Sequence, residues 1–163
     1  MSLIEELNAL EARIASLSQE IEALAAEDAA CQRRMTVAGI GVIIPSAVVS
    51  ASGTGGTFKQ GRYFAAWLSL VPRQMSTGGR TKLAGPLKLG NCYLRTLFVQ
   101  AAHVILVKKP AAAQPALWPW IERAAKRMTH RNLLATAPAN KLPRIAWAVL
   151  ARGHEYQPIA SPA

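Results

Sequence analysis

The segment NCYLRTLFVQAAHVILV, residues 91–107, decides the fold class of this 163-residue chain. Its apolar side chains recur every three or four residues, which is the spacing of one face of an α-helix; they are Leu94, Leu97, Phe98, Ala101, Val104 and Ile105. Arg95 falls on the opposite side of this helix, and Asn91 suits its N-cap. The segment therefore predicts an amphipathic helix with one face in a core.

Segments on both sides extend the helical pattern. Residues 62–72 carry apolar residues at helical spacing and are stopped by Pro72, and residues 115–128 and 140–153 predict two more helices, the last closed by Gly153. Pro138 and Pro143 are expected to interrupt this final helix. No segment alternates with period two over a useful length. The predicted fold is all-α: an N-terminal coiled-coil helix, then a compact helical domain.

Residues 35–52 predict the end of one helix, a tight turn at Gly39 and Gly41, and a second apolar helix. This is the pattern of a helix-hairpin-helix unit, in which glycines let backbone N–H groups at a helix N-terminus approach a DNA phosphate. Turns of this kind are also common between helices that only pack together. Taken alone, the pattern favours that simpler interpretation.

The first 34 residues form a separate predicted unit. Between residues 3 and 24 the apolar positions step alternately by four and three, which is a heptad seam suited to a partner helix; the seam is Leu3, Leu7, Leu10, Ile14, Leu17, Ile21 and Leu24. We expect self-association through residues 3–24. The alternative is a helix packed against the chain's own basic domain.

Charge divides the chain at the same place. Residues 1–34 carry three basic against seven acidic residues, whereas residues 35–163 carry 16 Lys and Arg against only Glu122 and Glu155. The second part is therefore expected to bind a polyanion. The two cysteines and three histidines of the whole chain have no metal-binding spacing. Without a long apolar run or a signal peptide, we expect a soluble, intracellular protein that is not associated with a membrane.

Residues 73–90 are expected to form a long basic loop, and long loops in compact domains are usually functional. The loop carries Ser76 and Thr77 directly before two glycines, together with a set of unbalanced cations, Arg73, Arg80, Lys82 and Lys88. From the residues alone, Ser76 is a turn residue, a phosphate ligand or a nucleophile.

Several of these stretches together resemble one family, the transposases of bacterial insertion sequences of the 116/110/902 group. The resemblance lies in AGIG (38–41), FKQGRYFAAWLSLVPRQMSTGGRTKLAG (58–85), LKLGNCYLRTLFVQAAHVIL (87–106) and NKLPRIAWAVLARGHEYQP (140–158). It corresponds to the C-terminal domain of that family, covers nearly all of residues 35–163, and agrees with the coiled coil that precedes this domain in the family.

The resemblance implies site-specific DNA recombination, that is, DNA transposition guided by a structured RNA of the element. The family's serine, which forms a phosphoserine link to DNA, falls on Ser76, with Thr77 as the adjacent alternative. The DNA-binding residues are then expected to be Gly39, Gly41, Arg73, Thr77, Arg80, Lys82, Lys88, Asn91 and Arg95. Arg and Lys near the serine would stabilise charge that develops on the attacked phosphate.

The chain also departs from the family. The family joins this domain to an RNase H-like domain with four metal-binding acids, and we expect no counterpart of that domain in this chain, where only Glu122 and Glu155 follow residue 34. We therefore expect no metal or other cofactor in this chain, with Mg²⁺ required only where that acidic domain is present. Three hypotheses follow: a recombinase fragment that bears the nucleophile, a non-catalytic nucleic-acid-binding module from a truncated transposase, and a dimerisation protein whose basic surface only aids solubility.

Overall fold

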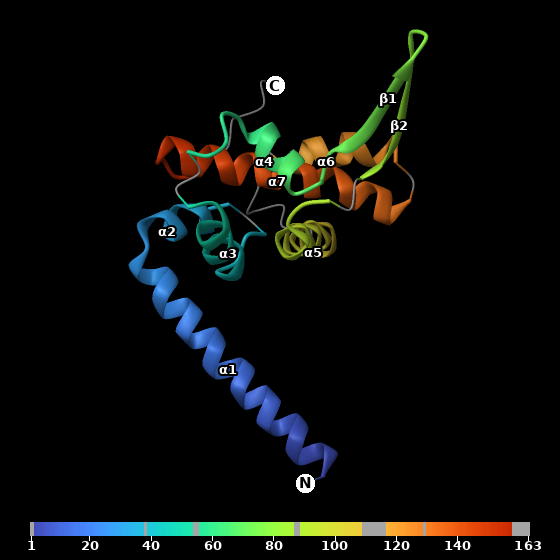
Figure 1. Cartoon of the computed structure of the whole chain (residues 1–163). Helices are drawn as coiled ribbons and strands as arrows, with labels where there is room; N and C mark the ends of the chain where they lie inside the picture. Colours follow the sequence, from blue (N-terminus) through green and yellow to red (C-terminus); the bar gives the residue numbers. More distant parts are fainter. Residues whose placement is uncertain are drawn as a thin grey trace.

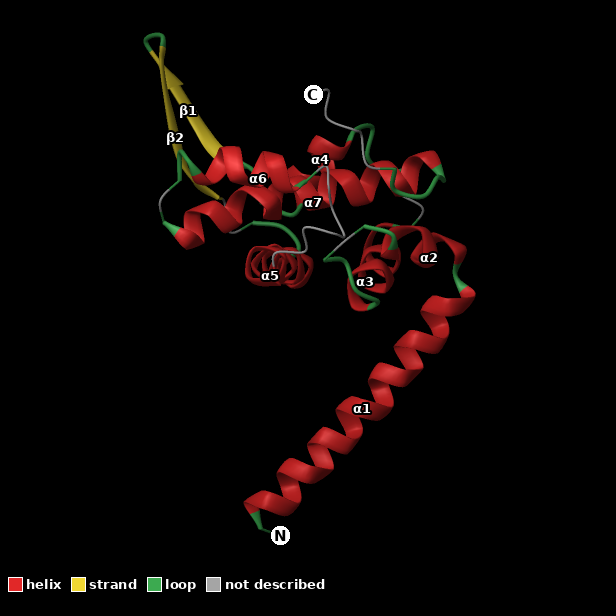
Figure 2. Cartoon of the chain, turned by 180° about the vertical axis from the view of Figure 1, so that it is seen from behind, coloured by secondary structure: helices red, strands yellow, loops and turns green. Residues whose placement is uncertain are grey.

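The computed structural model describes residues 2–37, 39–53, 56–86, 89–108, 117–128 and 130–157. Within these ranges the chain forms helices and one hairpin, and the helices after residue 28 pack into a body from which the first helix and the hairpin project (Figures 1 and 2). The elements are α1 (Leu3–Glu27), α2 (Ala29–Met35), α3 (Ile43–Ser52), α4 (Gly61–Trp67), β1 (Pro72–Thr77), β2 (Arg80–Pro86), α5 (Cys92–Lys108), α6 (Trp118–Ala125) and α7 (Arg131–Arg152). The all-α fold class is confirmed.

The core lies where α5 packs against α7 and α3. Phe98 of α5 is fully buried, and its ring meets the Phe64 ring of α4 edge-on with centroids 6.4 Å apart. Of the predicted inward face of α5, Leu94, Phe98 and Ile105 are buried, while Val104 is 43% exposed. Helix α5 thus supplies the wall that its apolar spacing predicts.

Helix α7 is longer than predicted, because it begins at Arg131 and runs without interruption through both prolines to Arg152. The expected break at Pro138 and Pro143 is wrong. Both rings are fully buried in the core, so apolar packing offsets the hydrogen bonds that a proline removes from a helix. The predicted stop is confirmed: Gly153 adopts φ 68° and its N–H donates to the Val149 carbonyl.

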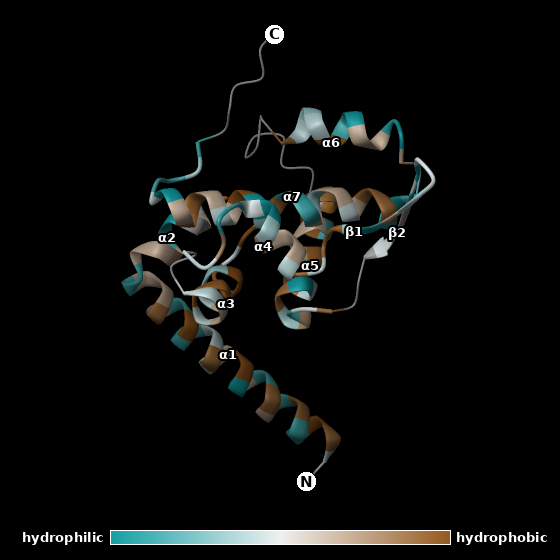
Figure 3. Cartoon of the chain, turned by 45° about the horizontal axis from the view of Figure 1, so that its top comes forward, coloured by the Kyte–Doolittle hydropathy of each residue, from teal (hydrophilic) through white to brown (hydrophobic). Residues whose placement is uncertain are grey.

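The acidic N-terminal segment is not one helix. Asp28 ends α1, and its Oδ1 accepts a hydrogen bond of 2.6 Å from the Ala30 N–H, so it caps α2 instead of continuing the first helix. Only the last turns of α1 contact the body, through α2 and α3. The alternative of a heptad seam packed within the chain is therefore wrong over most of its length: Leu7, Ile14 and Leu24 are 55, 64 and 67% exposed. In Figure 3 apolar and polar residues alternate along this projecting helix.

The predicted helix over residues 62–72 is cut short. Helix α4 ends at Trp67, and the chain turns at Ser69, which has φ 56°. The Asn140 side chain of α7 donates a 2.7 Å hydrogen bond to the Leu70 carbonyl and so ties this turn to the body. In α6, Ala124 is buried and Ala125 is exposed.

The prediction of a long loop over residues 73–90 is also wrong, because residues 72–86 form an antiparallel hairpin of β1 and β2. Each strand contacts, among the helices and strands of the described ranges, only the other strand. All of β1 is exposed. A two-stranded ribbon with both faces in solvent needs no buried face, and so it leaves no apolar alternation in its sequence.

Candidate nucleic-acid interface

The hairpin is closed by the shortest common turn. Gly78 and Gly79 have φ 58° and 74° and lie between the paired residues Thr77 and Arg80. Positive φ at both central residues defines the type I′ turn, whose twist matches that of the strands and which glycine adopts without steric cost. A register shift between Pro72 and Gln74 bends the base of the ribbon. The two glycines thus fix the register and present the hydroxyl pair at the end of the hairpin.

The pairing places the two hydroxyls on opposite faces. Thr77 pairs with Arg80, and Met75 pairs with Lys82, so these four side chains share one face. Ser76 pairs with Thr81 on the other face, where its Oγ accepts a 3.0 Å hydrogen bond from Gln74 Nε2. The cations of the hairpin tip therefore lie on the face of Thr77 and not on that of Ser76.

No activating group accompanies Ser76 in the described chain. A serine hydroxyl needs a base or strong electrostatic assistance to attack at neutral pH, and Ser76 Oγ accepts its hydrogen bond from the side-chain amide of Gln74. Across the described ranges, no three His, Cys, Asp or Glu side chains cluster in a way that would hold a metal ion. These residues therefore do not fit the Mg²⁺ site that the resemblance associates with an acidic domain. A base or metal for Ser76 would have to come from outside the part of the chain described.

Gly90, Asn91 and Arg95 join the hairpin to α5. A Cβ at Gly90 would lie 2.1 Å from the Trp67 carbonyl oxygen, so the end of α4 and the start of α5 touch through this glycine. Asn91 Oδ1 accepts a 3.0 Å hydrogen bond from the Leu94 N–H, which is the predicted cap. Arg95 Nη1 donates to the Leu89 carbonyl at 3.4 Å. The Gly-Asn pair therefore has a structural role that is independent of any contact with DNA.

The turn before α3 lies at a different place. A Cβ at Gly39 would come within 2.7 Å of two Ile105 side-chain atoms, so Gly39, with φ 80°, allows the turn to pack on α5. Because Asn91 and Ile105 are 14 residues apart in the sequence, about 20 Å of helix separates this turn from the base of the hairpin. A Cβ at Gly41 would meet nothing within 4 Å, and Gly41 lines a small hollow together with Ser18 and Glu22 of α1. An acidic side chain there disfavours a phosphate at the α3 N-terminus while α1 keeps this position.

The structure thus brings five predicted residues together on the hairpin: Arg73, Ser76, Thr77, Arg80 and Lys82. Asn91 and Arg95 lie at its base, whereas Gly39 and Gly41 do not join it. Lys88 lies outside the described residues.

The comparison with protein families matches this same part of the chain. Residues 31–116 match the family described as "Transposase IS116/IS110/IS902 family". The chain belongs to this transposase family. The matched residues include the turn before α3, α4, the hairpin and α5.

Full-length relatives of this transposase family agree. The chain is 45% identical over 96% of its length to a Pseudomonas aeruginosa protein named "Probable family 20 transposase". It is 38% identical over 86% of its length to the transposase for insertion sequence element IS1328 of Yersinia enterocolitica, and 35% identical over 94% to that for IS1111A of Coxiella burnetii. The chain spans less than half of these relatives, namely 46, 42 and 41% of their lengths. No helix of its described residues is long and apolar enough to cross a membrane.

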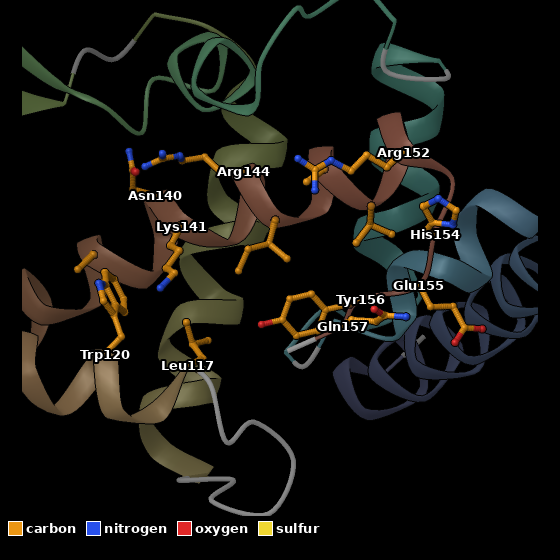
Figure 4. A pocket seen from close by; sticks show the side chains of 14 residues that line it. Leu117, Trp120, Asn140, Lys141, Arg144, Arg152, His154, Glu155, Tyr156 and Gln157 are labelled. Atoms are coloured by element: carbon orange, nitrogen blue, oxygen red, sulfur yellow. The ribbon is translucent and has the colours of Figure 1, made fainter. Parts of the chain in front are cut away.

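A cleft that the sequence patterns did not indicate lies beyond the matched region of the family. It has a volume of about 1050 Å³ and is enclosed by α6, α7 and the segment 153–157 (Figure 4). The Lys141 Nζ lies over the Trp120 ring, 4.1 Å from its centroid. Burial, and then repulsion by Arg123 and Arg144, lowers the pKa of the Lys141 ammonium, and burial raises the pKa of the Tyr156 phenol.

Proposed function

We propose that this chain is the DNA-binding part of a transposase and that it carries the serine nucleophile for DNA recombination. One observation carries the proposal: in a member of this transposase family, a ribbon that bears Ser76, Thr77 and cations without an acidic residue projects from the helical body with its whole first strand in solvent. Protein surfaces that bind the phosphates of DNA are exposed, basic and poor in acids.

The ribbon suits duplex DNA by shape as well as by charge. The major groove of B-DNA admits a two-stranded β-ribbon. Arg80 and Lys82 on one face can contact phosphates, and Arg73 extends the positive charge toward the base of the hairpin. Because the described hairpin contains no acid and packs on no other element, contact with DNA costs no internal interaction.

Ser76 is proposed as the attacking residue. Its Oγ would form a bond to a backbone phosphorus as one P–O bond of the DNA breaks, the hydroxyl proton passing to a base and the departing oxygen taking up a proton. The base and any metal-binding acids belong, in this proposal, to another domain or polypeptide, because the described residues offer neither. Gln74, which now donates to Ser76 Oγ, would have to release it.

Two alternatives rest on specific observations. Thr77, not Ser76, shares a face with Arg80 and Lys82, which favours Thr77 if those cations stabilise the attacked phosphate. The lack of a base beside either hydroxyl in the described chain favours a second function, a non-catalytic nucleic-acid-binding module. Self-association through the exposed seam of residues 3–24, a structured guide RNA and association with the nucleoid complete the proposal.

DNA binding is tested by salt dependence. The full chain should bind duplex DNA with an affinity that falls steeply with salt, by a logarithmic slope of about 0.9 for each phosphate neutralised. The double variant Arg80→Gln/Lys82→Gln should lower that slope by roughly two. Arg13→Gln, an exposed change on the acidic α1, is the control for loss of charge and should leave it unchanged. Binding through the hairpin is refuted if the affinity does not depend on salt. It is also refuted if Arg13→Gln lowers the salt slope as much as the hairpin variant does.

The nucleophile is tested with a catalytic partner. An intact relative that supplies the acidic domain is mixed with this chain and a DNA substrate, and the covalent protein–DNA adduct is measured on denaturing gels. Ser76→Ala should abolish the adduct on this chain and leave duplex affinity nearly unchanged, since one neutral hydroxyl contributes little beside charged phosphate contacts. Loss of the adduct only with Thr77→Ala moves the assignment to Thr77. If the adduct survives both changes, neither hydroxyl is the nucleophile, and the function that remains for this chain is that of a non-catalytic nucleic-acid-binding module.

A further inference from the structure

The cleft between α6 and α7 has a composition unlike that of a packing defect. One stripe of α7 contributes residues at helical spacing, in which cations alternate with small or apolar side chains: Ala137, Lys141, Arg144, Ile145, Ala148 and Arg152. Arg144 and Arg152 are eight residues apart, which separates them by about 12 Å along the helix. Of the residues that line the cleft, only Glu155 is acidic. One acidic residue therefore stands against the three cations of this stripe, so its positive charge is only partly compensated.

Aromatic rings and an apolar floor face these cations. Tyr156 extends into the space between α7 and Leu117 (Figure 4). Trp120 of α6 lies beside Lys141 of α7. The segment that carries Tyr156 is held in place, because its backbone N–H donates a 2.9 Å hydrogen bond to Thr36 Oγ1. Ile145 and Val149 supply the floor. The ring of Tyr156 is thus positioned by its backbone and remains half-buried at the mouth of the cleft.

We propose that this cleft binds an unpaired nucleotide of a single-stranded nucleic acid, with the base against Tyr156 and the apolar floor and its phosphates on Lys141 and Arg144. Flat rings and phosphates occur together in nucleotides, and aromatic side chains beside cations are the means by which proteins hold single strands. A base inside a duplex has both faces covered by its neighbours and cannot reach Tyr156. An acidic peptide would satisfy the cations but not the aromatic wall.

The electrostatics of the cleft agree with this ligand. Lys141 is partly desolvated and is repelled by Arg123 and Arg144, which is the condition that an incoming phosphate relieves. The cleft lies on α6, α7 and the segment 153–157, and none of its lining residues belongs to the hairpin. The inference shares with the proposed function only the premise that the chain binds nucleic acid. It concerns a different surface and a different form of the ligand.

The test measures binding of the full chain to fluorescein-labelled oligothymidylate, oligouridylate and duplex DNA by anisotropy. Tyr156→Leu removes the ring but keeps the backbone bond to Thr36, and it should weaken single-strand binding roughly 5- to 150-fold, the range found when a stacking residue is removed. Tyr156→Phe keeps the ring and should bind within about twofold of the original chain. Lys141→Gln should lower the single-strand salt slope by about 0.7. Thermal melting checks that each variant is folded.

The hairpin variant Arg80→Gln/Lys82→Gln separates the two proposals. If the cleft is the single-strand site, Tyr156→Leu reduces affinity for the oligonucleotides and leaves duplex affinity unchanged, whether or not the hairpin variant loses duplex binding. Tighter binding of oligouridylate assigns RNA as the source of the nucleotide, and tighter binding of oligothymidylate assigns DNA. An equal loss with Tyr156→Phe and Tyr156→Leu overturns the proposal, as does an equal loss on duplex DNA.

Cross-linking gives an independent readout. An oligonucleotide containing 5-iodouracil, irradiated in complex with the chain, should cross-link to Tyr156 or Trp120, and inorganic polyphosphate, which has no bases, should compete poorly for this product. Cross-links confined to residues outside 117–157, or competition by polyphosphate as effective as that by the oligonucleotide, would show that only charge is recognised and would refute the site.

Discussion

The turn of the hairpin can be broken without touching the helical core. In the double variant Gly78→Ala/Gly79→Ala, two residues with side chains would have to adopt φ near 58° and 74°. Each L-residue in the left-handed region costs about 1–2 kcal/mol, so the closed hairpin should lose roughly 2–4 kcal/mol. A two-stranded ribbon is marginally stable by itself. Because β1 and β2 contact no other element of the described chain, nothing else holds the ribbon closed.

Limited digestion with trypsin measures this opening, because Arg80 and Lys82 lie at the turn. When the hairpin opens and closes faster than it is cut, cleavage follows the population of the open form. The loss of 2–4 kcal/mol corresponds to an increase in that population of roughly 30-fold or more, up to full opening. Helical circular dichroism should not change. Duplex affinity should fall as the ribbon loses its ordered display of cations.

Gly78→Asn is the matched control. Asparagine tolerates the left-handed region, and Asn-Gly is the preferred pair of the type I′ turn. This variant should be cut at nearly the rate of the original chain. If the double alanine variant is cut no faster than Gly78→Asn, the type I′ turn does not close the hairpin. The strand register that pairs Thr77 with Arg80 would then have to be revised.

Three further predictions concern the body. Gly90→Ala should destabilise the fold by more than about 2 kcal/mol in urea unfolding, because the added Cβ would overlap the Trp67 carbonyl and the φ of residue 90 is 102°. In the control Gly85→Ala the added Cβ would meet nothing within 4 Å, so this change should have little effect. Asn91→Ala should cost about 1 kcal/mol through loss of the α5 cap, and Asn91→Asp should restore most of it; equal losses would show that the cap does not stabilise the helix. Burial raises the pKa of Tyr156, so its contribution to stability is present below the unfolded-state pKa of about 10 and is lost as the pH rises through the folded-state pKa. The alkaline loss of unfolding free energy should therefore be smaller in Tyr156→Phe, and an unchanged profile would contradict the assignment.

The helices were predictable where one face is buried, and the hairpin was not, for the same physical reason. The spacing of Leu94, Phe98 and Ile105 reports a buried face, and α5 follows it. Strand β1 carries no such pattern because both of its faces meet solvent. A local signal was nevertheless present: two glycines between Thr77 and Arg80 are a two-residue hairpin turn, and this turn predicts the register.

The remaining differences depend on tertiary contacts. Pro138 and Pro143 read as helix breaks until their burial in the core is known. The cleft joins Trp120, Lys141 and Tyr156 from three segments that have no common period, so no window of sequence contains it. Ser76 and Thr77 lie on an exposed basic element, but their opposite orientation could be derived only from the strand register.

The freely projecting α1 would act as a ruler in any pair of chains that forms through its seam. Its 25 residues give it a length of about 37 Å. In a parallel pair the two helical bodies would sit side by side and direct both hairpins toward one stretch of DNA. In a fully overlapped antiparallel pair the bodies would stand at opposite ends of the rod, and the two hairpins would engage DNA segments separated by at least its length. The direction in which two such helices pair would therefore determine whether an assembly holds one DNA site or bridges two.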